Sequence, residues 1–259
     1  MTSMKLKGKR ALVTAGAQGI GLAISRGLAD AGCDVFVHYK SSRDAAETLC
    51  RELASRGVRA VSGAGDLTDA TECRRVVDQA ATELGGLDVL VNNAGSLVAR
   101  KKFEEADEAF WAEVMQLNLD SARWVTLAAI PHLVSAGVSR GGASVVNLSS
   151  VAGRHGGGPG AIAYSTAKGA MLTLTRGLAS EYALKGVRVN AVTPGLILGS
   201  AFHAQHTPEE TQRKIIAGIP LGRAGTTEDV ARAVVYLASE FDGFITGATL
   251  DINGGVYLM

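Results

Sequence analysis

This sequence of 259 residues has little of what marks membrane, secreted or nucleic-acid-binding proteins. No apolar run approaches the roughly 20 residues that a helix needs to span a bilayer. The opening stretch, MTSMKLKGKR, lacks the apolar segment of a signal peptide. Aromatic residues make up only 5% of the chain and the net charge is +1, so there is neither a stacking surface nor a basic field for nucleic acid. We therefore expect a cytoplasmic protein that binds neither membrane nor nucleic acid.

Cysteines and other metal ligands are scarce as well. The three cysteines, Cys33, Cys50 and Cys73, are odd in number and have no CxxC spacing. This pattern predicts reduced thiols, as in a cytoplasmic protein. His203 and His206 have a spacing that zinc ligands use, but no acidic or cysteine partner completes a site. We expect no metal.

Glycine, in contrast, is abundant, with 32 residues, or about twice the average share. Short apolar segments of strand type alternate with segments that have helical spacing, such as 22–32 and 44–57, the second ending in Gly57. Alternation over the whole length predicts a parallel sheet with helices on both faces. No linker or repeat divides the chain, so we expect residues 1–259 to form one domain. The expected strands are 10–15, 34–39, 58–64, 87–94, 143–150, 187–193 and 248–252.

The first expected strand leads directly into a glycine-rich turn, TAGAQGIG, at residues 14–21. A strand, a tight turn and a helix N-terminus form an anion site, because unpaired N–H groups and the helix dipole face the turn. Glycine there lets the pyrophosphate of a dinucleotide approach the backbone. An ordinary tight connection has the same pattern, but the position after the first strand favours a dinucleotide.

Four more clusters follow later strands, at the edge of an open α/β sheet where ligands bind. They are Asp66-Leu67, the NNAG sequence at 92–95, Ser149-Ser150 and Pro194-Gly195.

Together these features resemble the short-chain dehydrogenase/reductase family over essentially the whole chain. The family's Thr-Gly-x-x-x-Gly-x-Gly turn is similar to Thr14–Gly21, with Ala15 in place of the first glycine. That replacement requires a position without a strongly positive φ. The family's Asn-Asn-Ala-Gly is unaltered at 92–95. The resemblance implies a Rossmann-type, doubly wound sheet of seven mostly parallel strands in the order 3-2-1-4-5-6-7, and an oxidoreductase that uses NAD(P).

The resemblance also supplies a catalytic set. Ser150 fits better than Ser149, because the family's serine directly precedes an apolar residue, here Val151. By resemblance, Lys168 also holds the nicotinamide ribose and Asn118 anchors a water in a proton relay. The expected catalytic residues are Asn118, Ser150, Tyr164 and Lys168.

The chemistry of Tyr164 and Lys168 agrees with this assignment. On a helix, residues four apart lie on one face, with Cβ atoms about 5–6 Å apart. Reduction of a carbonyl by hydride leaves an alkoxide that a tyrosine can protonate, and Ser150 would polarise the carbonyl oxygen. Lowering the tyrosine pKa from about 10 to about 7 requires about 4 kcal/mol. One ammonium at about 4 Å supplies that much at an effective dielectric constant near 20. A solvated surface pair on an ordinary helix is the alternative.

The end of the second strand predicts the cofactor. An acidic residue there would bind the ribose 2′-hydroxyl of NAD and repel the 2′-phosphate of NADP. Tyr39 occupies this position, and the donors of Lys40, Ser41 and Arg43 that follow suit a phosphate, although a solvated loop has the same composition. We predict that NADP(H) is preferred, with NAD(H) also possible. The expected cofactor-binding residues are Thr14, Gly16, Gln18, Gly19, Ile20, Gly21, Tyr39, Lys40, Ser41, Asp66, Leu67, Asn93, Ala94, Gly95, Tyr164, Lys168, Pro194, Gly195 and Ile197.

The substrate is indicated by a lid and by basic residues around the expected mouth. Residues 196–222 correspond to the family's substrate lid, and their polar composition fits a lid better than a metal site. Arg100, Arg154, His155 and His203 suit an acidic substrate, although solvated loop charges are an equally good interpretation of any one of them.

Two subgroups of the family resemble particular stretches of the chain. NNAGSLVARK and GRHGGGPGAIAYSTAK are similar to the reductases of alginate breakdown, which reduce an α-keto sugar acid, deoxyhexoseulose uronate, with NADPH. The ending IPLGRAG…EDVA is shared with β-ketoacyl-carrier-protein reductases. We favour the sugar acid, with the ketoacyl thioester as the alternative. A non-catalytic nucleotide-binding relative is a second alternative, but none of the catalytic or cofactor motifs is lost.

Two expected helices indicate assembly. Residues 119–137 contain only two charged side chains and residues 163–184 only three. Helices that are apolar on nearly all sides need more cover than one sheet face provides, and a second copy supplies it. By resemblance to the family, we expect a homo-oligomer, either a dimer or a homotetramer.

Overall fold

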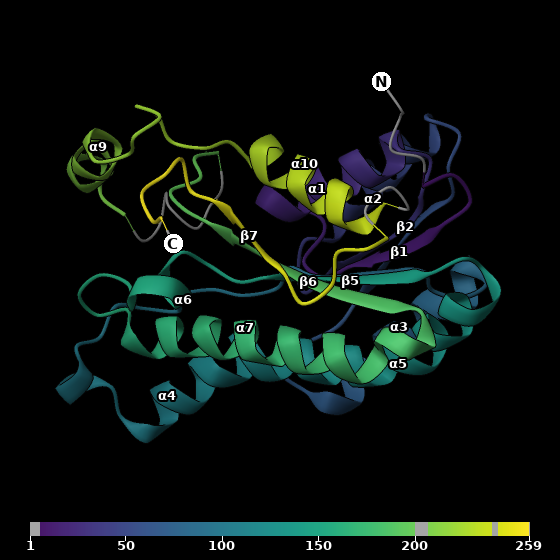
Figure 1. Ribbon diagram of the computed structural model, residues 1–259, viewed down its shortest axis with the longest axis horizontal. Helices are drawn as coiled ribbons and strands as arrows, with labels where there is room; N and C mark the ends of the chain where they lie inside the picture. Colours follow the sequence, from purple (N-terminus) through teal and green to yellow (C-terminus); the bar gives the residue numbers. More distant parts are fainter. Residues whose placement is uncertain (1–5, 200–206, 240–242, 259) are drawn as a thin grey trace.

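The computed structural model describes residues 6–199, 207–239 and 243–258, and they form three layers with a sheet in the middle (Figure 1). Seven strands lie in the order β3-β2-β1-β4-β5-β6-β7, and every neighbouring pair is parallel. This confirms the expected doubly wound, Rossmann-type sheet. The expected strand bounds are met within two residues at each end. The strands are β1 (Arg10–Val13), β2 (Asp34–Tyr39), β3 (Ala60–Ala64), β4 (Val89–Asn92), β5 (Ala143–Leu148), β6 (Val187–Pro194) and β7 (Thr249–Ile252).

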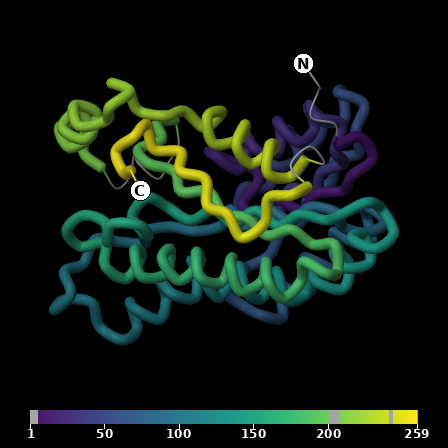
Figure 2. Tube along the Cα trace, in the orientation of Figure 1, coloured from purple at the N-terminus to yellow at the C-terminus, as the bar shows by residue number. Residues whose placement is uncertain are grey.

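Helices cover both faces of the sheet, as Figures 1 and 2 show: α1, α2 and α10 lie on one side, and α3, α5 and α7 on the other. None of the helices in the described ranges has the length and apolar character of a membrane span. The helices are α1 (Gly19–Asp30), α2 (Arg43–Ala54), α3 (Ala70–Leu84), α4 (Glu108–Met115), α5 (Ser121–Ser139), α6 (Ala152–His155), α7 (Ile162–Tyr182), α9 (Glu209–Ala217) and α10 (Thr227–Ala238), with short turns η1 (Phe103–Glu105), η2 (Gln116–Asp120) and η3 (Ala183–Lys185).

The core is divided by the sheet, because successive side chains of a strand point to opposite faces. Ala11 and Val13 of β1 pack on the side of α1 and α10, while Leu12 between them packs on the side of α3 and α5. Every residue of β4 and β5 is buried. Such continuous burial is typical of parallel strands covered on both faces.

Helix ends follow local capping rules. Asp69 begins α3 by accepting hydrogen bonds from the N–H groups of Thr71 and Glu72, and Gly85, with φ +78°, ends it. The helix expected over 44–57 ends three residues early, at Ala54. Gly57, with φ +83°, provides the left-handed residue of the following turn instead.

Candidate active site

A cavity of about 650 Å³ opens at the carboxyl edge of the sheet, near α6 and α9 in Figure 1. Its walls come from the turn after β1, the segments after β4, β5 and β6, helices α7 and α9, and the C-terminal segment. Ligands of open α/β sheets bind at this edge, so the expected location agrees with the cavity. The predicted cofactor residues that line it are Gln18, Gly19, Ile20, Gly21, Asn93, Gly95, Tyr164, Lys168, Pro194, Gly195 and Ile197.

The start of α1 forms one wall of this cavity and suits an anion. Its N-cap, Gln18, makes no capping bond, because its amide donates to Ser42 Oγ at 2.8 Å instead. No acidic residue lies in the first turn. The N–H groups at the helix start therefore have no side-chain acceptor, which is the arrangement that binds phosphate groups. A Cβ at Gly21 would collide with the Ala15 carbonyl oxygen, so glycine is needed for the turn to close. These residues fit the pyrophosphate of a nicotinamide dinucleotide.

Ala15 does not behave as the sequence predicts. Its φ is +49°, in the left-handed region that a residue with a Cβ enters at a cost. The Ala15 N–H donates to His38 Nδ1 at 3.0 Å, and its carbonyl oxygen accepts from Asn93 Nδ2 at 3.1 Å. The expectation that this position avoids a strongly positive φ is therefore wrong. Neither partner is close in sequence, so local pattern gave no signal.

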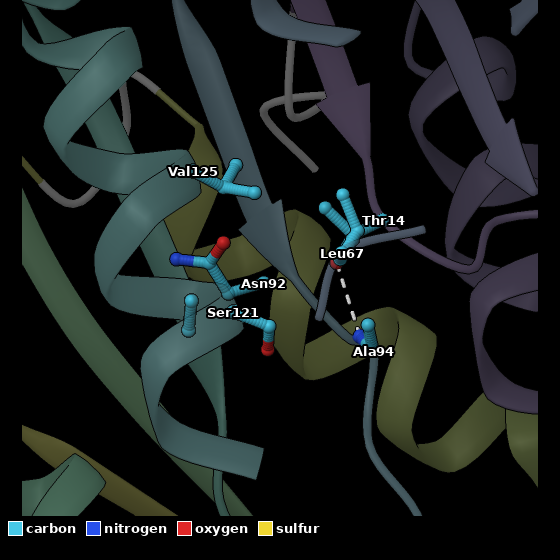
Figure 3. Close-up of a pocket in the computed structure, with 7 residues that line it drawn as sticks. Thr14, Leu67, Asn92, Ala94, Ser121 and Val125 are labelled. Atoms are coloured by element: carbon cyan, nitrogen blue, oxygen red, sulfur yellow. Dashed lines mark hydrogen bonds between the residues drawn. The ribbon is translucent and has the colours of Figure 1, made fainter. Parts of the chain in front are cut away.

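Four further predicted cofactor residues, Thr14, Gly16, Leu67 and Ala94, do not line this cavity, and Thr14, Leu67 and Ala94 line a smaller pocket instead. Thr14 Oγ1 accepts from the Ala94 N–H at 3.0 Å (Figure 3) and from the Asn93 N–H at 2.8 Å, and thereby joins the glycine turn to the NNAG segment. A Cβ at Gly16 would lie 2.9 Å from the Val13 carbonyl oxygen. Thr14, Gly16 and Ala94 thus fix the shape of the turn beside the cavity.

The rim at the end of β2 also differs from expectation. The Tyr39 side chain is 7% exposed and packs into the core with Val37, because residues two apart on a strand share a face. It is therefore not presented to a ribose. Lys40 Nζ pairs with Asp66 Oδ2 at 2.7 Å, and hydrogen bonds from Lys40 and Thr68 lower the pKa of Asp66 to about 2. Lys40 and Ser41 are exposed, and the carboxylate of Asp66 is ionised between its two donors.

Asn118 lies in a π-helical turn, η2, that joins α4 to α5 without a break. Its Nδ2 donates to the carbonyl oxygens of Ser96 at 2.8 Å and Val114 at 2.9 Å, and its Oδ1 accepts from the Ser96 N–H at 3.0 Å. The fully buried side chain thus ties this turn to the segment after β4. Isolated π-turns inside helices often mark functional sites, and no sequence signal predicted this one.

Ser150, Tyr164 and Lys168 come together at one wall of the cavity. The Tyr164 and Ser150 side chains are hydrogen-bonded, and Ser150 Oγ also accepts from the Ala152 N–H at 3.1 Å. Ser149 also lines the cavity, but its buried hydroxyl donates to the Lys168 carbonyl oxygen at 2.7 Å. The geometry therefore favours Ser150 over its neighbour for contact with a ligand beside Tyr164.

Lys168 is hydrogen-bonded to the end of a strand, and a glycine leaves room for its side chain. Lys168 Nζ donates to the Leu148 carbonyl oxygen at 2.8 Å and lies 5.8 Å from the centroid of the Tyr164 ring. A Cβ at Gly95 would lie 2.7 Å from Asn118 Oδ1 and 3.0 Å from Lys168 Nζ. Only glycine at this position lets both side chains converge on the NNAG segment.

Burial sets the protonation states of this pair. Burial raises the pKa of Tyr164 to about 12, against a smaller lowering by the hydrogen bond with Ser150. Burial also lowers the pKa of Lys168 to about 8. We expected an ammonium at about 4 Å to lower the pKa of Tyr164 to about 7. The structure shows the opposite direction, because burial raises the pKa of the phenol. At neutral pH Tyr164 keeps its proton, which is the form that a proton donor needs.

The predicted substrate residues divide into two groups. Arg100 and His155 line the cavity. Arg154 does not, because its guanidinium pairs with Asp251 at 3.2 Å and packs over the Tyr257 ring at 5.9 Å, which corrects the expectation for this residue. His203 and His206 lie outside the described residues.

One basic residue of the site was missed from the sequence. Lys214 of α9 lines the cavity within the segment 196–222 that was expected to form the lid. It forms an exposed ion pair with Glu210, and this i, i+4 spacing is typical of an ordinary helix surface. Together with Arg100 and Lys168 it makes the lining cationic: the described residues around the cavity include no Asp or Glu. Such a lining favours an anionic ligand.

Comparison with known sequences shows similarity over nearly the full chain. A sequence profile described as enoyl-(acyl carrier protein) reductase matches residues 14–257. The 3-oxoacyl-[acyl-carrier-protein] reductase FabG of Staphylococcus aureus is 36% identical over 254 residues, which cover 96% of this chain and 98% of the relative. The 4-formylbenzenesulfonate dehydrogenase TsaC1/TsaC2 of Comamonas testosteroni is 39% identical over 256 residues, covering 97% and 99%.

Solved structures agree with these matches. An NADH-dependent reductase, A1-R′, responsible for alginate metabolism superposes with a TM-score of 0.91 at 35% identity, covering 98% of this chain and 99% of that one. The same reductase complexed with NAD gives a TM-score of 0.88 at 34% identity, covering 98% of each chain. The resemblances to ketoacyl-carrier-protein reductases and to a reductase of alginate metabolism are both confirmed.

Proposed function

Because this chain belongs to the short-chain dehydrogenase/reductase family of oxidoreductases, we propose that it is a nicotinamide-dependent carbonyl reductase in which Tyr164 is the general acid and base. One observation carries the proposal. The hydrogen-bonded side chains of Tyr164 and Ser150, with Lys168, lie in the wall of a cavity whose other wall is the glycine turn 14–21.

Each side chain has a role that follows from its contacts. The bound cofactor supplies the hydride. Ser150 holds the substrate carbonyl oxygen by a hydrogen bond and polarises it. Tyr164 donates its proton to that oxygen, and burial keeps the proton on the phenol until then. The Lys168 ammonium stabilises the phenolate that remains, and Asn118 holds the η2 turn and the NNAG segment in register behind the site.

We propose an anionic substrate, specifically an α-keto sugar acid such as deoxyhexoseulose uronate. The cationic lining supports it, with Arg100 and His155 on one side and Lys214 on the lid segment. The similarity to the alginate-metabolism reductase agrees. So does the named substrate of the Comamonas relative, since 4-formylbenzenesulfonate also carries a carbonyl and a negative charge.

β-Ketoacyl-carrier-protein reduction is the second candidate, because the Staphylococcus FabG is 36% identical over 96% of this chain. The two candidates are separated by giving the purified protein an α-keto uronate and an acetoacetyl thioester in parallel, each with NADPH. We expect the keto acid to have the higher kcat/KM. Reduction of the thioester alone would reject the sugar-acid proposal, and no turnover of any carbonyl would reject the reductase.

For the cofactor we propose that NADPH is preferred to NADH. The last residue of β2 is Tyr39 and not an acidic residue, and Lys40, Ser41 and Arg43 after it are exposed. To bind the 2′-phosphate, Lys40 would break its ion pair with Asp66. The A1-R′ neighbour is an NADH-dependent reductase, which makes the comparison of cofactors a direct test. A kcat/KM for NADH equal to or above that for NADPH would contradict the preference.

A further inference from the structure

Ala15 holds an unfavourable backbone conformation at a position that faces the cavity. With φ +49° it is one of two non-glycine residues of positive φ in the part of the chain described, and the other, Val98, does not line the cavity. Such a conformation persists only where the surroundings determine it. Ala15 lies between the end of β1 and the start of α1, so its conformation sets the direction in which the glycine turn points its N–H groups.

Two side chains, the buried His38 and the half-buried Asn93, hold the Ala15 backbone from opposite sides. His38 Nδ1 accepts its N–H at 3.0 Å, and Asn93 Nδ2 donates to its carbonyl oxygen at 3.1 Å. Both polar groups of one residue are thus fixed by partners from β2 and from the segment after β4. The left-handed conformation is imposed from outside the turn.

The hydrogen bonds of His38 determine which of its ring nitrogens carries the hydrogen. Its Nε2 lies 3.0 Å from the Gly65 carbonyl oxygen, which can only accept, so Nε2 carries the hydrogen and Nδ1 is the bare acceptor that Ala15 requires. The ring is 2% exposed, and burial lowers its pKa, so it remains neutral.

The backbone around His38 strengthens the same connection. The Gly16 N–H donates to the His38 carbonyl oxygen at 2.8 Å, and the Gly65 N–H donates to the Tyr39 carbonyl oxygen at 3.0 Å. His38 therefore joins the turn after β1 to the end of β3. Asp66, one of the expected cofactor-binding residues, directly follows Gly65.

From this geometry we propose that His38 is a positioning residue of the cofactor site. Its neutral imidazole holds Ala15 in the left-handed conformation and so keeps the turn 14–21 ready to bind the pyrophosphate. This inference rests on the proposed nicotinamide-dependent function. It predicts that His38 controls cofactor affinity and not the chemical step, because the imidazole contacts the turn and none of the proposed catalytic residues.

Three substitutions separate the two bonds of the imidazole. In His38→Asn, the amide oxygen can take the place of Nδ1 and accept from Ala15. In His38→Gln, the amide reaches the place of Nε2 and keeps the Gly65 contact but loses the Ala15 contact. Ala15→Gly makes the left-handed conformation accessible without the imidazole. The matched control is Ser144→Ala. This substitution removes a buried hydrogen bond of 3.1 Å to the Leu237 carbonyl oxygen, and Ser144 does not line the cavity.

The experiment measures the Kd of NADPH by fluorescence titration and the KM and kcat of the reductase assay. We expect His38→Gln to weaken NADPH binding and raise cofactor KM by about ten-fold, with kcat within about two-fold of wild type. His38→Asn should lose about three-fold or less, and adding Ala15→Gly to His38→Gln should restore most of the affinity. Ser144→Ala should leave the Kd unchanged.

Each other outcome overturns the inference. These are an unchanged Kd in His38→Gln, a loss of kcat at unchanged KM, an equal loss in His38→Asn, and a failure of Ala15→Gly to restore binding. If His38→Gln does not fold, the double variant should be recovered folded, and its failure to fold would overturn the inference as well. A wild-type protein that binds neither NADPH nor NADH would instead contradict the proposed function.

Discussion

Replacement of the buried lysine should make the protein more stable while removing its activity. Burial lowers the pKa of Lys168 from 10.5 to about 8, so below pH 8 the folded state holds an ammonium whose charge costs free energy. A change of 2.5 units at 1.36 kcal/mol each is about 3 kcal/mol. Lys168→Met removes this cost but leaves the Leu148 carbonyl oxygen without its donor, which costs about 1 kcal/mol. The expected gain in the free energy of unfolding at pH 7 is about 2 kcal/mol.

The pH dependence distinguishes this cause from a general packing effect. Between pH 8 and 10.5 the unfolded chain binds more protons at Lys168 than the folded one, so the wild type gains stability as pH rises through that window. The methionine variant has no such group. The excess of its free energy of unfolding over that of the wild type should therefore be largest below pH 8, and it should disappear or reverse towards pH 10.5.

Urea unfolding followed by circular dichroism, at several pH values from 7 to above 10, measures the stability gain at pH 7 and its change with pH. Lys185→Met is the control, because Lys185 is exposed after α7 and its loss should change stability by about 0.5 kcal/mol or less at every pH. The kcat of Lys168→Met should fall by about 100-fold or more. A variant less stable than wild type at pH 7, or a stability difference that does not vary with pH, would refute the reasoning.

Three further variants test the proposed site and assembly. Tyr164→Phe should lower kcat by about 1,000-fold or more and leave the Kd of NADPH within about two-fold, and retained turnover would remove the residue from its proposed role. Lys214→Met should raise the KM of an anionic keto acid by about five- to ten-fold and leave that of an uncharged ketone unchanged; an equal change for both would contradict charge recognition. Leu127, 61% exposed on α5, should lie in an oligomer interface, so Leu127→Glu should reduce the mass measured by light scattering, whereas a wild-type monomer would reject the interface.

The architecture could be predicted because its signals are local and repeated. Continuous apolar runs such as those of β4 and β5 indicate strands buried on both faces, and each is followed by a polar or glycine cluster at the edge where the cavity opens. The placement of Tyr164 and Lys168 on one helix face follows from helical geometry alone. These features need no information about distant parts of the chain.

The departures arise where a distant partner decides what a side chain does. Ala15 is held by residues 23 and 78 positions away. Arg154 is engaged by Asp251, 97 positions away, and so does not line the cavity. Tyr39 is different, because the alternation of β2 already placed it on the core face with Val37, and that signal was available in the sequence.

The opposite pKa shifts of Tyr164 and Lys168 have one cause, and together they suit the proposed reduction. Burial of the pair raises the pKa of the phenol to about 12 and lowers that of the ammonium to about 8. The phenol therefore stays protonated until a developing alkoxide takes its proton, and the phenolate that forms lies near an ammonium that releases a proton more readily than an exposed lysine does. In the proposed reduction, Lys168 would stabilise the phenolate while charged and, because its pKa is about 8, would exchange protons under working conditions. If this is correct, the rate of reduction falls as pH rises through about 8, where Lys168 loses its charge, and a rate that holds constant to pH 10 would assign the stabilising charge to another group.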